Sequence, residues 1–419
     1  MEHGIIHVFV AKSYKIIICD SKNMEQQKLV LAYSGGLDTS YIVKKFSEEG
    51  NYEVHTVLVN TGGFSAEELK TVEDKAIRLG AKSHKSIDIT DKYYQKCIRY
   101  LVYGNVLKNN AYPLSVSSER TFQAIEIANY AKELGTNLIA HGSTGAGNDQ
   151  VRFDLVFKLV IPDVQIITPV RDENLSRETE IDYLKNNGIE DDWKKSIYSI
   201  NKGIWGTSIG GKETLSSNKT LPEEAYLNQL EEKEAVQIEL GFDKGQLVSI
   251  NRDNYKNTVD AIQNLNEIAG KYAIGRGMHV GDTVIGSKGR VGFEAPAAVL
   301  IIESHRTLEK YVLSKWQMHW KEQLANWYGM LLHEAQYFEP VMRNIEKFLE
   351  DSQERVTGKV IVKLMPYRFE IEGIESDFDL LNAKFGSYGE ESKLWTGEDV
   401  KGFTHILANS MKIHQAVGK

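Results

Sequence analysis

Between residues 28 and 169, short apolar runs of strand length alternate with segments of helical periodicity. The strand-like runs lie at 29–33, 53–59, 83–89, 137–141 and 164–169. The helical segments lie at 38–49, 66–79, 90–107, 119–134 and 149–160. Because this alternation is typical of parallel sheets built from crossover units, we expect an α/β fold with a doubly wound parallel sheet.

A doubly wound sheet binds its ligands beyond the carboxyl ends of its strands. Three of the predicted strands end at Tyr33, Val59 and His141, and polar, Gly-containing segments follow each of them. The loops after these strands should therefore converge on one site.

Length and charge limit the classes of protein that the chain can belong to. The 419 residues suffice for two or three domains with a sizeable core. The net charge of −8 argues against a protein that binds nucleic acid through its phosphate backbone. No apolar run is long enough to span a membrane, and we find no signal-peptide pattern. We expect a cytoplasmic protein without nucleic-acid or membrane partners.

Only two cysteines occur, Cys19 and Cys97. Two cysteines exclude a disulfide framework and a four-thiolate zinc site, and they fit a reducing compartment.

Composition and periodicity divide the chain into four parts. We predict an N-terminal extension at 1–27, in which Met24 is a candidate native start, and a nucleotide-binding domain at 28–192. A second domain follows at 193–390, with a C-terminal tail at 391–419. The second domain begins as a mixed α+β region, and later residues 359–371 resemble a strand. From Thr396 onward we expect a polar tail.

A stripe of large apolar residues marks one helix of the second domain. Its members follow one another in steps of 3, 4, 4, 3 and 4 residues: Leu313, Trp316, Trp320, Leu324, Trp327 and Leu331. This spacing places them on one face of an α-helix. We expect that face to form core or a subunit interface.

The run KLVLAYSGGLDTSYIVKK leads from a strand into a helix through Gly35 and Gly36. Free amides at a helix N-terminus attract phosphate, and adjacent glycines let the main chain approach a ligand closely. A capped turn without a ligand would explain one glycine but not the accompanying hydroxyls. The run is not a Walker A loop, because no Lys lies between Ser34 and Ser40.

Residues 206–212, GTSIGGK, do match the spacing of a Walker A loop. However, Glu213 stands where Ser or Thr should hold magnesium, and no clear strand precedes the run. We therefore reject a second nucleotide loop there.

A second Gly-rich loop, HGSTGAGNDQVRFD, follows the strand NLIAH. Asn148, Asp149 and Arg152 should share one face of the helix that follows, beside the glycines. A purely structural ion pair between Asp149 and Arg152 is the alternative.

The loop SGGLDTS resembles the pyrophosphate loop of the ATP pyrophosphatases. Together with HGSTGAGNDQVRF, it makes residues 28–395 similar to the argininosuccinate synthase family. The resemblance implies a cytoplasmic homotetramer, in which 193–390 is a synthetase and multimerisation domain with a C-terminal helical oligomerisation segment. It also implies a ligase that joins citrulline to aspartate and converts ATP to AMP and pyrophosphate. ATP would arrive with Mg²⁺, and no tightly bound cofactor is expected.

The resemblance also assigns residues to the three substrates. To ATP it assigns Ala32, Tyr33, Ser34, Gly35, Gly36, Leu37, Asp38, Thr39, Ser40, Asn60 and Gly142. To citrulline it assigns Tyr112, Ser117, Asn148, Arg152, Ser199 and Ser208, with Arg120 as a neighbour. To aspartate it assigns Thr144, Asn148 and Asp149.

Two positions depart from the family pattern. Gly281 stands where many members have a citrulline-binding Glu, and Phe293 stands where they have Tyr. We hypothesise that Asp282, or a repositioned Glu294, recognises that end of citrulline and that the chain is a divergent branch.

Other readings remain open at this stage. The chain could be another ATP pyrophosphatase, either an amide synthetase or a tRNA-modifying thiolase, or a non-catalytic adenine-nucleotide-binding module. A glutamine-dependent synthetase or a thiolase would need a reactive Cys, and a thiolase would also need a basic face. No residue is assigned as a general acid or base.

Overall fold

The computed structural model describes residues 26–191, 193, 198–382, 386–387, 391–392 and 394–418. Met24, Cys19 and all but the last two residues of the predicted extension 1–27 lie outside these ranges. Among the described residues, no helix has both the length and the apolar composition that crossing a membrane requires.

Five parallel strands form the sheet of the N-terminal half, in the order β3-β2-β1-β4-β5. They are β1 (Gln27–Ala32), β2 (Tyr52–Asn60), β3 (Ser83–Asp88), β4 (Leu138–Ala140) and β5 (Gln165–Ile167). The chain moves outward from β1 to β3 and then returns to β4, so the strand order reverses between β1 and β4. The predicted doubly wound α/β sheet is confirmed.

Helices cover both faces of this sheet. Leu29 and Leu31 pack with the helices on one face of the sheet, which form the first layer, whereas Val30 packs with the helices on the other face, which form the second layer. This alternation is the two-residue period of a strand. The first layer contains α1 (Leu37–Glu49), α2 (Ala66–Arg78) and α8 (Arg177–Asn186); the second contains α5 (Ser115–Leu134) and α6 (Asp149–Val160). A short helix, α7 (Pro169–Asp172), follows β5.

Two helices differ from their predicted extents. The segment 90–107 is not one regular helix but α3 (Thr90–Tyr93), a π-helical turn (Tyr94–Ile98) and α4 (Arg99–Tyr103). Helix α5 begins at Ser115, four residues before its predicted start, directly after Leu114 in a left-handed conformation. Ser117 therefore lies in the first turn of a helix.

Two antiparallel sheets build the second half. One has the order β11-β12-β7-β6 and the other β10-β9-β8-β13-β14. The first contains β6 (Ser199–Gly203), β7 (Gly206–Gly210), β11 (Arg276–Asp282) and β12 (Lys288–Glu294). The second contains β8 (Val236–Asp243), β9 (Gln246–Ile250), β10 (Asp253–Asn254), β13 (Gly358–Met365) and β14 (Arg368–Glu375).

Two sequence interpretations are settled by these sheets. The strand-like stretch 359–371 is a hairpin of β13 and β14, because the chain turns at Tyr367, whose φ is +66°. The Walker-like run 206–212 lies in strand β7 and the turn after it, where a short 3₁₀ helix (Lys212–Leu215) follows. Its rejection as a nucleotide loop is confirmed.

Helices complete the second half. They are α9 (Thr258–Gly270), α10 (Pro296–Val312), α11 (Lys315–His333) and α12 (Pro340–Ser352), with short 3₁₀ turns at Glu223–Ala225 and Leu380–Asn382. The predicted helix with the apolar stripe is α11. Its Trp316, Trp320 and Trp327 are 64%, 56% and 58% exposed, so they do not form core within one chain, and their role in a subunit interface stays a prediction. Leu313, Leu324 and Leu331 of the same stripe do pack with the core. A neighbouring face of α11, including Ala325 and Tyr328, is buried instead.

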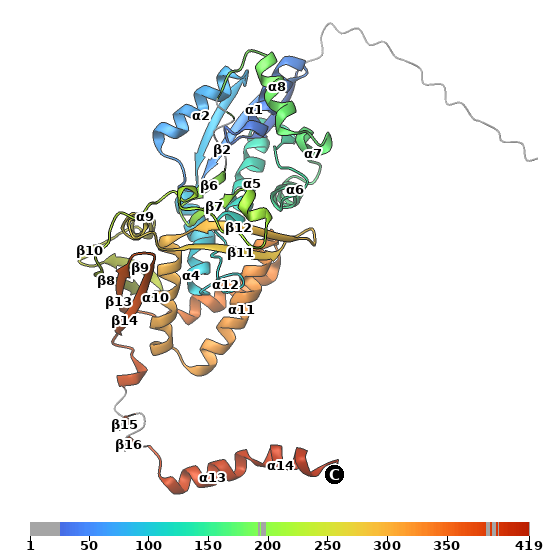
Figure 1. The fold of residues 1–419 in the computed structure, drawn as a ribbon. Coiled ribbons are helices and arrows are strands. Elements are labelled where there is room, and N and C mark those ends of the chain that lie inside the picture. Colours follow the sequence, from blue (N-terminus) through green and yellow to red (C-terminus); the bar gives the residue numbers. More distant parts are fainter. Residues whose placement is uncertain are drawn as a thin grey trace, which may run out of the picture.

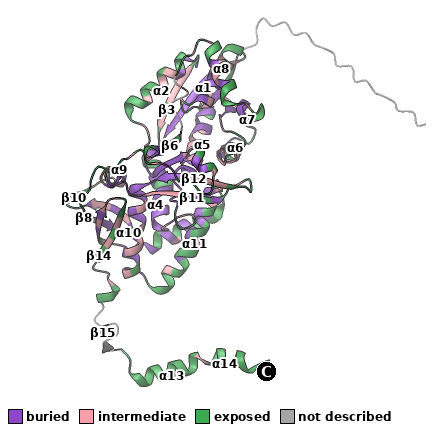
Figure 2. Cartoon of the chain, viewed as in Figure 1, coloured by how far each residue is buried: buried purple, intermediate pink, exposed green. Residues whose placement is uncertain are grey.

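The C-terminal residues form helices rather than a merely polar tail. After a two-residue strand pair, β15 (Gly386–Ser387) with β16 (Glu391–Ser392), come α13 (Gly397–Leu407) and α14 (Asn409–Ala416). Thr396 and Asp399 cap α13 reciprocally, which stabilises its first turn. Figure 1 shows both helices standing away from the body of the chain, and Figure 2 shows them exposed along their length.

Candidate functional site

A cleft of about 1360 Å³ lies between the carboxyl end of the parallel sheet and the sheet that contains β6, β7, β11 and β12. Figure 1 shows these two parts of the chain stacked one above the other. The loops after β1 and β4 line the cleft, as the reversal of strand order predicts. Most sequence-predicted site residues line it too: Ala32, Tyr33, Ser34, Gly36, Leu37, Asp38, Thr39, Tyr112, Ser117, Arg120, Gly142, Thr144, Asn148, Asp149, Arg152, Ser199, Ser208 and Asp282.

The loop after β1 presents main-chain amides at the N-terminus of α1. Gly36 occupies the cap position, and no side chain accepts a hydrogen bond from the first amides of the helix as a cap. Gly35 has a φ of +75°, a conformation that favours glycine, and its carbonyl accepts a 2.8 Å hydrogen bond from Lys75 Nζ. This loop can therefore hold a phosphate group through its backbone.

The loop after β4 packs directly against the loop after β1. A Cβ on Gly142 would lie 3.0 Å from Asp38 Cβ, so only glycine allows this approach without a shift. His141 Nδ1 accepts a hydrogen bond from the amide of Ser143 at 3.2 Å, which leaves Nε2 to donate to Asp154 at 2.8 Å. His141 is 1% exposed and fixes the start of the second loop.

Arg120, Asp149 and Arg152 form a charged network at the other end of the cleft. Asp149 accepts from Arg120 Nε at 2.9 Å and from Arg152 Nη1 at 2.8 Å. Burial alone would raise the pKa of Asp149, but the two guanidinium groups outweigh it and hold that pKa below its usual value. The ion pair between Asp149 and Arg152, which was the structural alternative to a binding role, is therefore present, and both residues form part of the cleft wall.

This network is anchored to the second half of the chain. Arg152 is 4% exposed and donates from Nε to the carbonyl oxygen of His333 at 3.0 Å. Arg120 donates from Nη2 to Asn201 Oδ1 at 2.8 Å. The amide of Val284 donates to Asn148 Oδ1 at 2.9 Å. Three separate segments of the second half thus fix the side chains that α5 and α6 contribute.

Ser199 and Ser208 lie on neighbouring strands, β6 and β7. Asn201 is the residue of β6 that is paired with Ser208, and Ser199 is paired with Gly210. The antiparallel register therefore places both serines on the wall that faces α5 and α6.

Three predicted ATP residues do not line the cleft: Gly35, Ser40 and Asn60. Asn60 is 3% exposed, and its Oδ1 accepts hydrogen bonds from the amides of Gly62, Gly63 and Phe64. It shapes the loop after β2 in this structure.

The residues proposed to compensate for Gly281 have other partners. The Asp282 side chain is 74% exposed and forms an ion pair with Lys288. Glu294 is 2% exposed and accepts hydrogen bonds from the amides of Leu227 and Asn228. Asp282 lines the cleft, but its carboxylate is exposed and paired with Lys288, and Glu294 does not line the cleft.

Two histidines that the sequence reasoning missed line this end of the cleft. His279 stacks on Tyr112 at 5.1 Å between ring centroids, and a Cβ on Gly281 would lie 2.7 Å from its Nε2. His333 lies at the end of α11 and lines the same end. Burial is the main reason that the pKa falls to about 4 for His279 and to about 3 for His333. Both rings are therefore neutral at pH 7.

Arg177, from α8, also lines the cleft and was missed. A lone histidine or arginine in a long sequence carries no local pattern, so only the fold could identify these three residues.

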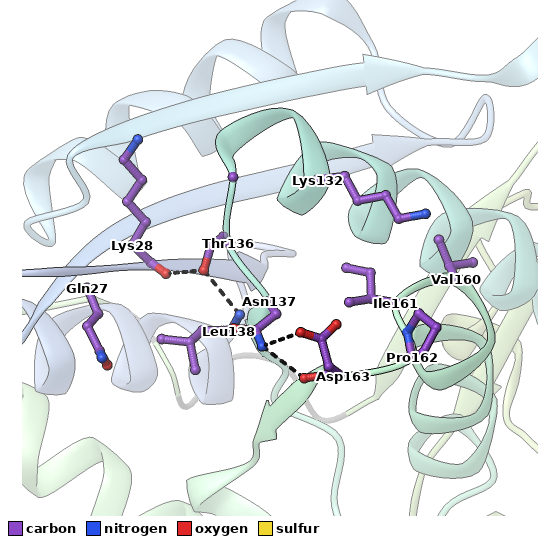
Figure 3. Close-up of a pocket in the computed structure, with 11 residues that line it drawn as sticks. Gln27, Lys28, Lys132, Thr136, Asn137, Leu138, Val160, Ile161, Pro162 and Asp163 are labelled. Atoms are coloured by element: carbon purple, nitrogen blue, oxygen red, sulfur yellow. Dashed lines mark hydrogen bonds between the residues drawn. The ribbon is translucent and has the colours of Figure 1, made fainter.

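A second hollow of about 670 Å³ lies at the opposite end of the parallel sheet, where β1 and β4 begin. Figure 3 shows the hydrogen bonds of Thr136 with Lys28 and Leu138, and those of Asn137 with Asp163. These bonds connect the loops to one another and to β1. Among the residues that the structure describes, no cluster of three or more His, Cys, Asp or Glu side chains could hold a metal ion.

Comparison with known proteins places both halves of the chain in one family. Residues 28–190 match the model of the arginosuccinate synthase N-terminal HUP domain, and residues 198–414 match that of the arginosuccinate synthase C-terminal domain. The argininosuccinate synthase of Dictyoglomus turgidum is 39% identical over 386 residues, which cover 92% of this chain and 96% of the relative.

Two further relatives, from other organisms, are similar over most of the chain. The argininosuccinate synthase of Methanocaldococcus jannaschii is 38% identical over 86% of this chain and 92% of its own length. That of Xanthomonas campestris is 35% identical over 94% of this chain and its own full length. The resemblance first drawn from SGGLDTS and HGSTGAGNDQVRF is confirmed: the chain belongs to the argininosuccinate synthase family.

Proposed function

We propose that the cleft joins citrulline to aspartate to form argininosuccinate, with ATP converted to AMP and pyrophosphate. One observation carries this proposal: a phosphate-type loop and a network able to hold two amino acids face each other across a single cleft. Family membership supports the same reaction and its place in arginine biosynthesis.

ATP would bind at the loop after β1. The amides at the start of α1, together with Ser34 and Thr39, would hold its phosphates, and Gly142 would let the second loop close against them. The Mg²⁺ that accompanies ATP as part of the substrate would neutralise charge on the departing pyrophosphate. The assignments of Ala32, Gly35, Ser40 and Asn60 to ATP stay predictions.

The two amino acids would bind at the charged end of the cleft. We assign citrulline to Tyr112, Ser117, Asn148, Arg152, Ser199 and Ser208, with Arg120 as a neighbour, and aspartate to Thr144, Asn148 and Asp149. Because Asp149 is ionised, it can accept a hydrogen bond from an amino group but would repel a carboxylate. Asp149 would therefore face the amine of aspartate.

The reaction needs a leaving group, because the carbon of a free ureido group is a poor electrophile. The ureido oxygen of citrulline would attack the α-phosphate of ATP and release pyrophosphate, and the aspartate amine would then displace AMP. Alignment of the reactants can supply about 7 to 11 kcal/mol in favourable cases. We assign no general acid or base.

The alternative enzymes depend on a reactive thiol. Cys97 is buried in the core, does not line the cleft, and has its pKa raised by burial. Its thiol is therefore held in the unreactive protonated form. Among the described residues, no cysteine supports an amide synthetase or a thiolase.

A pyrophosphate-release assay tests the proposed function. With ATP, citrulline and aspartate present, we expect pyrophosphate and AMP in equal amounts, and we expect no sustained release when citrulline is omitted. Turnover that does not depend on citrulline would overturn the proposal, and ATP binding without turnover would indicate a nucleotide-binding module.

We further propose that the domains of the chain are 28–192 and 193–390, followed by a tail at 391–419. We also propose that the protein is a homotetramer in the cytoplasm. Apolar side chains exposed on α13 and α14 support assembly: Val400, Phe403, Ile406, Leu407, Met411 and Ile413. The exposed tryptophans of α11 support a second contact surface. Light scattering should give four times the chain mass, and Phe403→Asp should reduce it; a monomer in the unaltered protein would contradict the assembly.

A further inference from the structure

A buried carboxyl group lies behind the loop that follows β1. Glu180, on α8, is 1% exposed and is within hydrogen-bonding reach of the Asp38 side chain in α1. Its Oε2 atom is fully buried and has no other hydrogen-bond partner among the described residues. The two acidic side chains therefore face each other across the contact between α1 and α8.

The surroundings of Glu180 offer little positive charge. On its own helix, Arg177 attracts the charged form, but that side chain is exposed. On α1, Asp38 and Tyr41 face Glu180, and neither is a cation. Around these groups, Leu37 and Leu184 form apolar core.

Two ionised carboxylates cannot share such a contact without strong repulsion, so one of them retains a proton. Glu180 is the more deeply buried of the two and loses more hydration on ionising. Burial first, and the charge of Asp38 second, raise the pKa of Glu180 to about 8. At neutral pH its carboxyl group can therefore donate a hydrogen bond to the Asp38 carboxylate.

Asp38 connects this pair to the site. It lines the cleft, lies in the first turn of α1, and packs against Gly142 of the second loop. A change in the position of Asp38 would move the start of α1, whose amides face the cleft.

We propose that Glu180 is a positioning residue for ATP: in its protonated form it donates a hydrogen bond to Asp38 and so fixes the phosphate loop. Ionisation of Glu180 sets two carboxylates against each other and loosens the loop. ATP affinity therefore falls as the pH rises through the alkaline range, by up to about tenfold per pH unit. This inference rests on the proposed function only in assuming that ATP binds at this loop.

Calorimetry with ATP alone, without citrulline or aspartate, tests the inference. At pH 9, in buffers of different ionisation enthalpy, the unaltered protein should take up nearly one proton when ATP binds. Glu180→Gln keeps a neutral donor of the same length. It should bind ATP at pH 7 within about twofold of the unaltered protein and take up no such proton at pH 9.

Two further variants complete the design. Asp182→Asn changes an exposed carboxylate on the same helix and should behave as the unaltered protein does. Glu180→Ala removes the donor and should weaken ATP binding about tenfold at pH 7, with thermal unfolding measured alongside to confirm that each variant is folded.

The inference is overturned if Glu180→Gln keeps the alkaline proton uptake, or if it weakens ATP binding at pH 7 as much as Glu180→Ala does. Should Glu180→Gln not fold, absence of proton uptake by the unaltered protein at pH 9 would overturn it equally. If proton-linked ATP binding is found but no argininosuccinate is formed, the proposed function fails and this inference stands.

Discussion

The two ends of the cleft are built in different ways. The end proposed to bind ATP, here called the ATP end, consists of main-chain amides and hydroxyls from one short strand-to-helix loop, closed by a glycine of the next loop. The end proposed to bind citrulline and aspartate, here called the amino-acid end, is a network of charged side chains from α5 and α6, which segments far along the chain hold in place. Recognition through the backbone needs only local sequence, whereas recognition through a buried side-chain network needs the assembled fold.

The largest effect is expected from Arg152→Met. The change leaves Asp149 with one guanidinium and frees the carbonyl of His333, so we expect a loss of about 3 kcal/mol in unfolding free energy. Citrulline-dependent pyrophosphate release should fall at least about a hundredfold. Chemical denaturation and the release assay measure the two effects. Lys158→Met, an exposed change on the same helix, is the control, and equal effects of both variants would contradict the network.

Two glycine substitutions, one at each end of α1, separate an effect on ATP binding from an effect on stability. Gly36→Ala adds a methyl group at the cap of α1 without requiring a positive φ, so it should raise the KM for ATP about tenfold and change stability little. Gly50→Ala, at the other end of α1 where φ is +72°, should cost about 1 kcal/mol of stability and leave that KM unchanged. The reverse pattern would show that the phosphates bind elsewhere.

Because His279 is neutral in the folded protein, we predict that the free energy of unfolding depends on pH. As the pH falls below 6.5 the unfolded chain protonates its histidines, whereas folded His279 stays neutral down to about 4. The stability that His279 contributes is therefore present above pH 6.5 and is lost as the pH falls, by up to about 1.4 kcal/mol per pH unit. His279→Gln should flatten this slope in thermal unfolding, whereas His319→Gln, an exposed change, should not. If the unaltered protein and His279→Gln show the same dependence of stability on pH, folded His279 is charged and the prediction is wrong.

The smallest effect is expected from Asp282→Asn. Because this carboxylate is exposed and paired only with Lys288 at the surface, we expect the KM for citrulline to change by less than about threefold. A tenfold increase in steady-state assays would instead support Asp282 as the group that compensates for Gly281.

The sequence assigned residues at both ends of the cleft, but Gly35, Ser40 and Asn60 do not line it, and three residues that do line it were missed. The strand-loop-helix order around Gly35 and Gly36 has a local cause, so its position in the fold followed from strand periodicity and glycine alone. The places of Arg177, His279 and His333 in the cleft wall depend on α8, β11 and α11 meeting the cleft, and nothing near these residues in the sequence shows that contact. The exposed tryptophans of α11 illustrate the same limit, since an apolar stripe does not tell which surface covers it.

The central claim is that citrulline and ATP react directly within one cleft. It can be tested with citrulline that carries ¹⁸O in its ureido group, in a single turnover with ATP and aspartate. Attack of that oxygen on the α-phosphate predicts that the label is found in AMP and not in pyrophosphate. Unlabelled AMP accompanied by argininosuccinate formation would contradict the account.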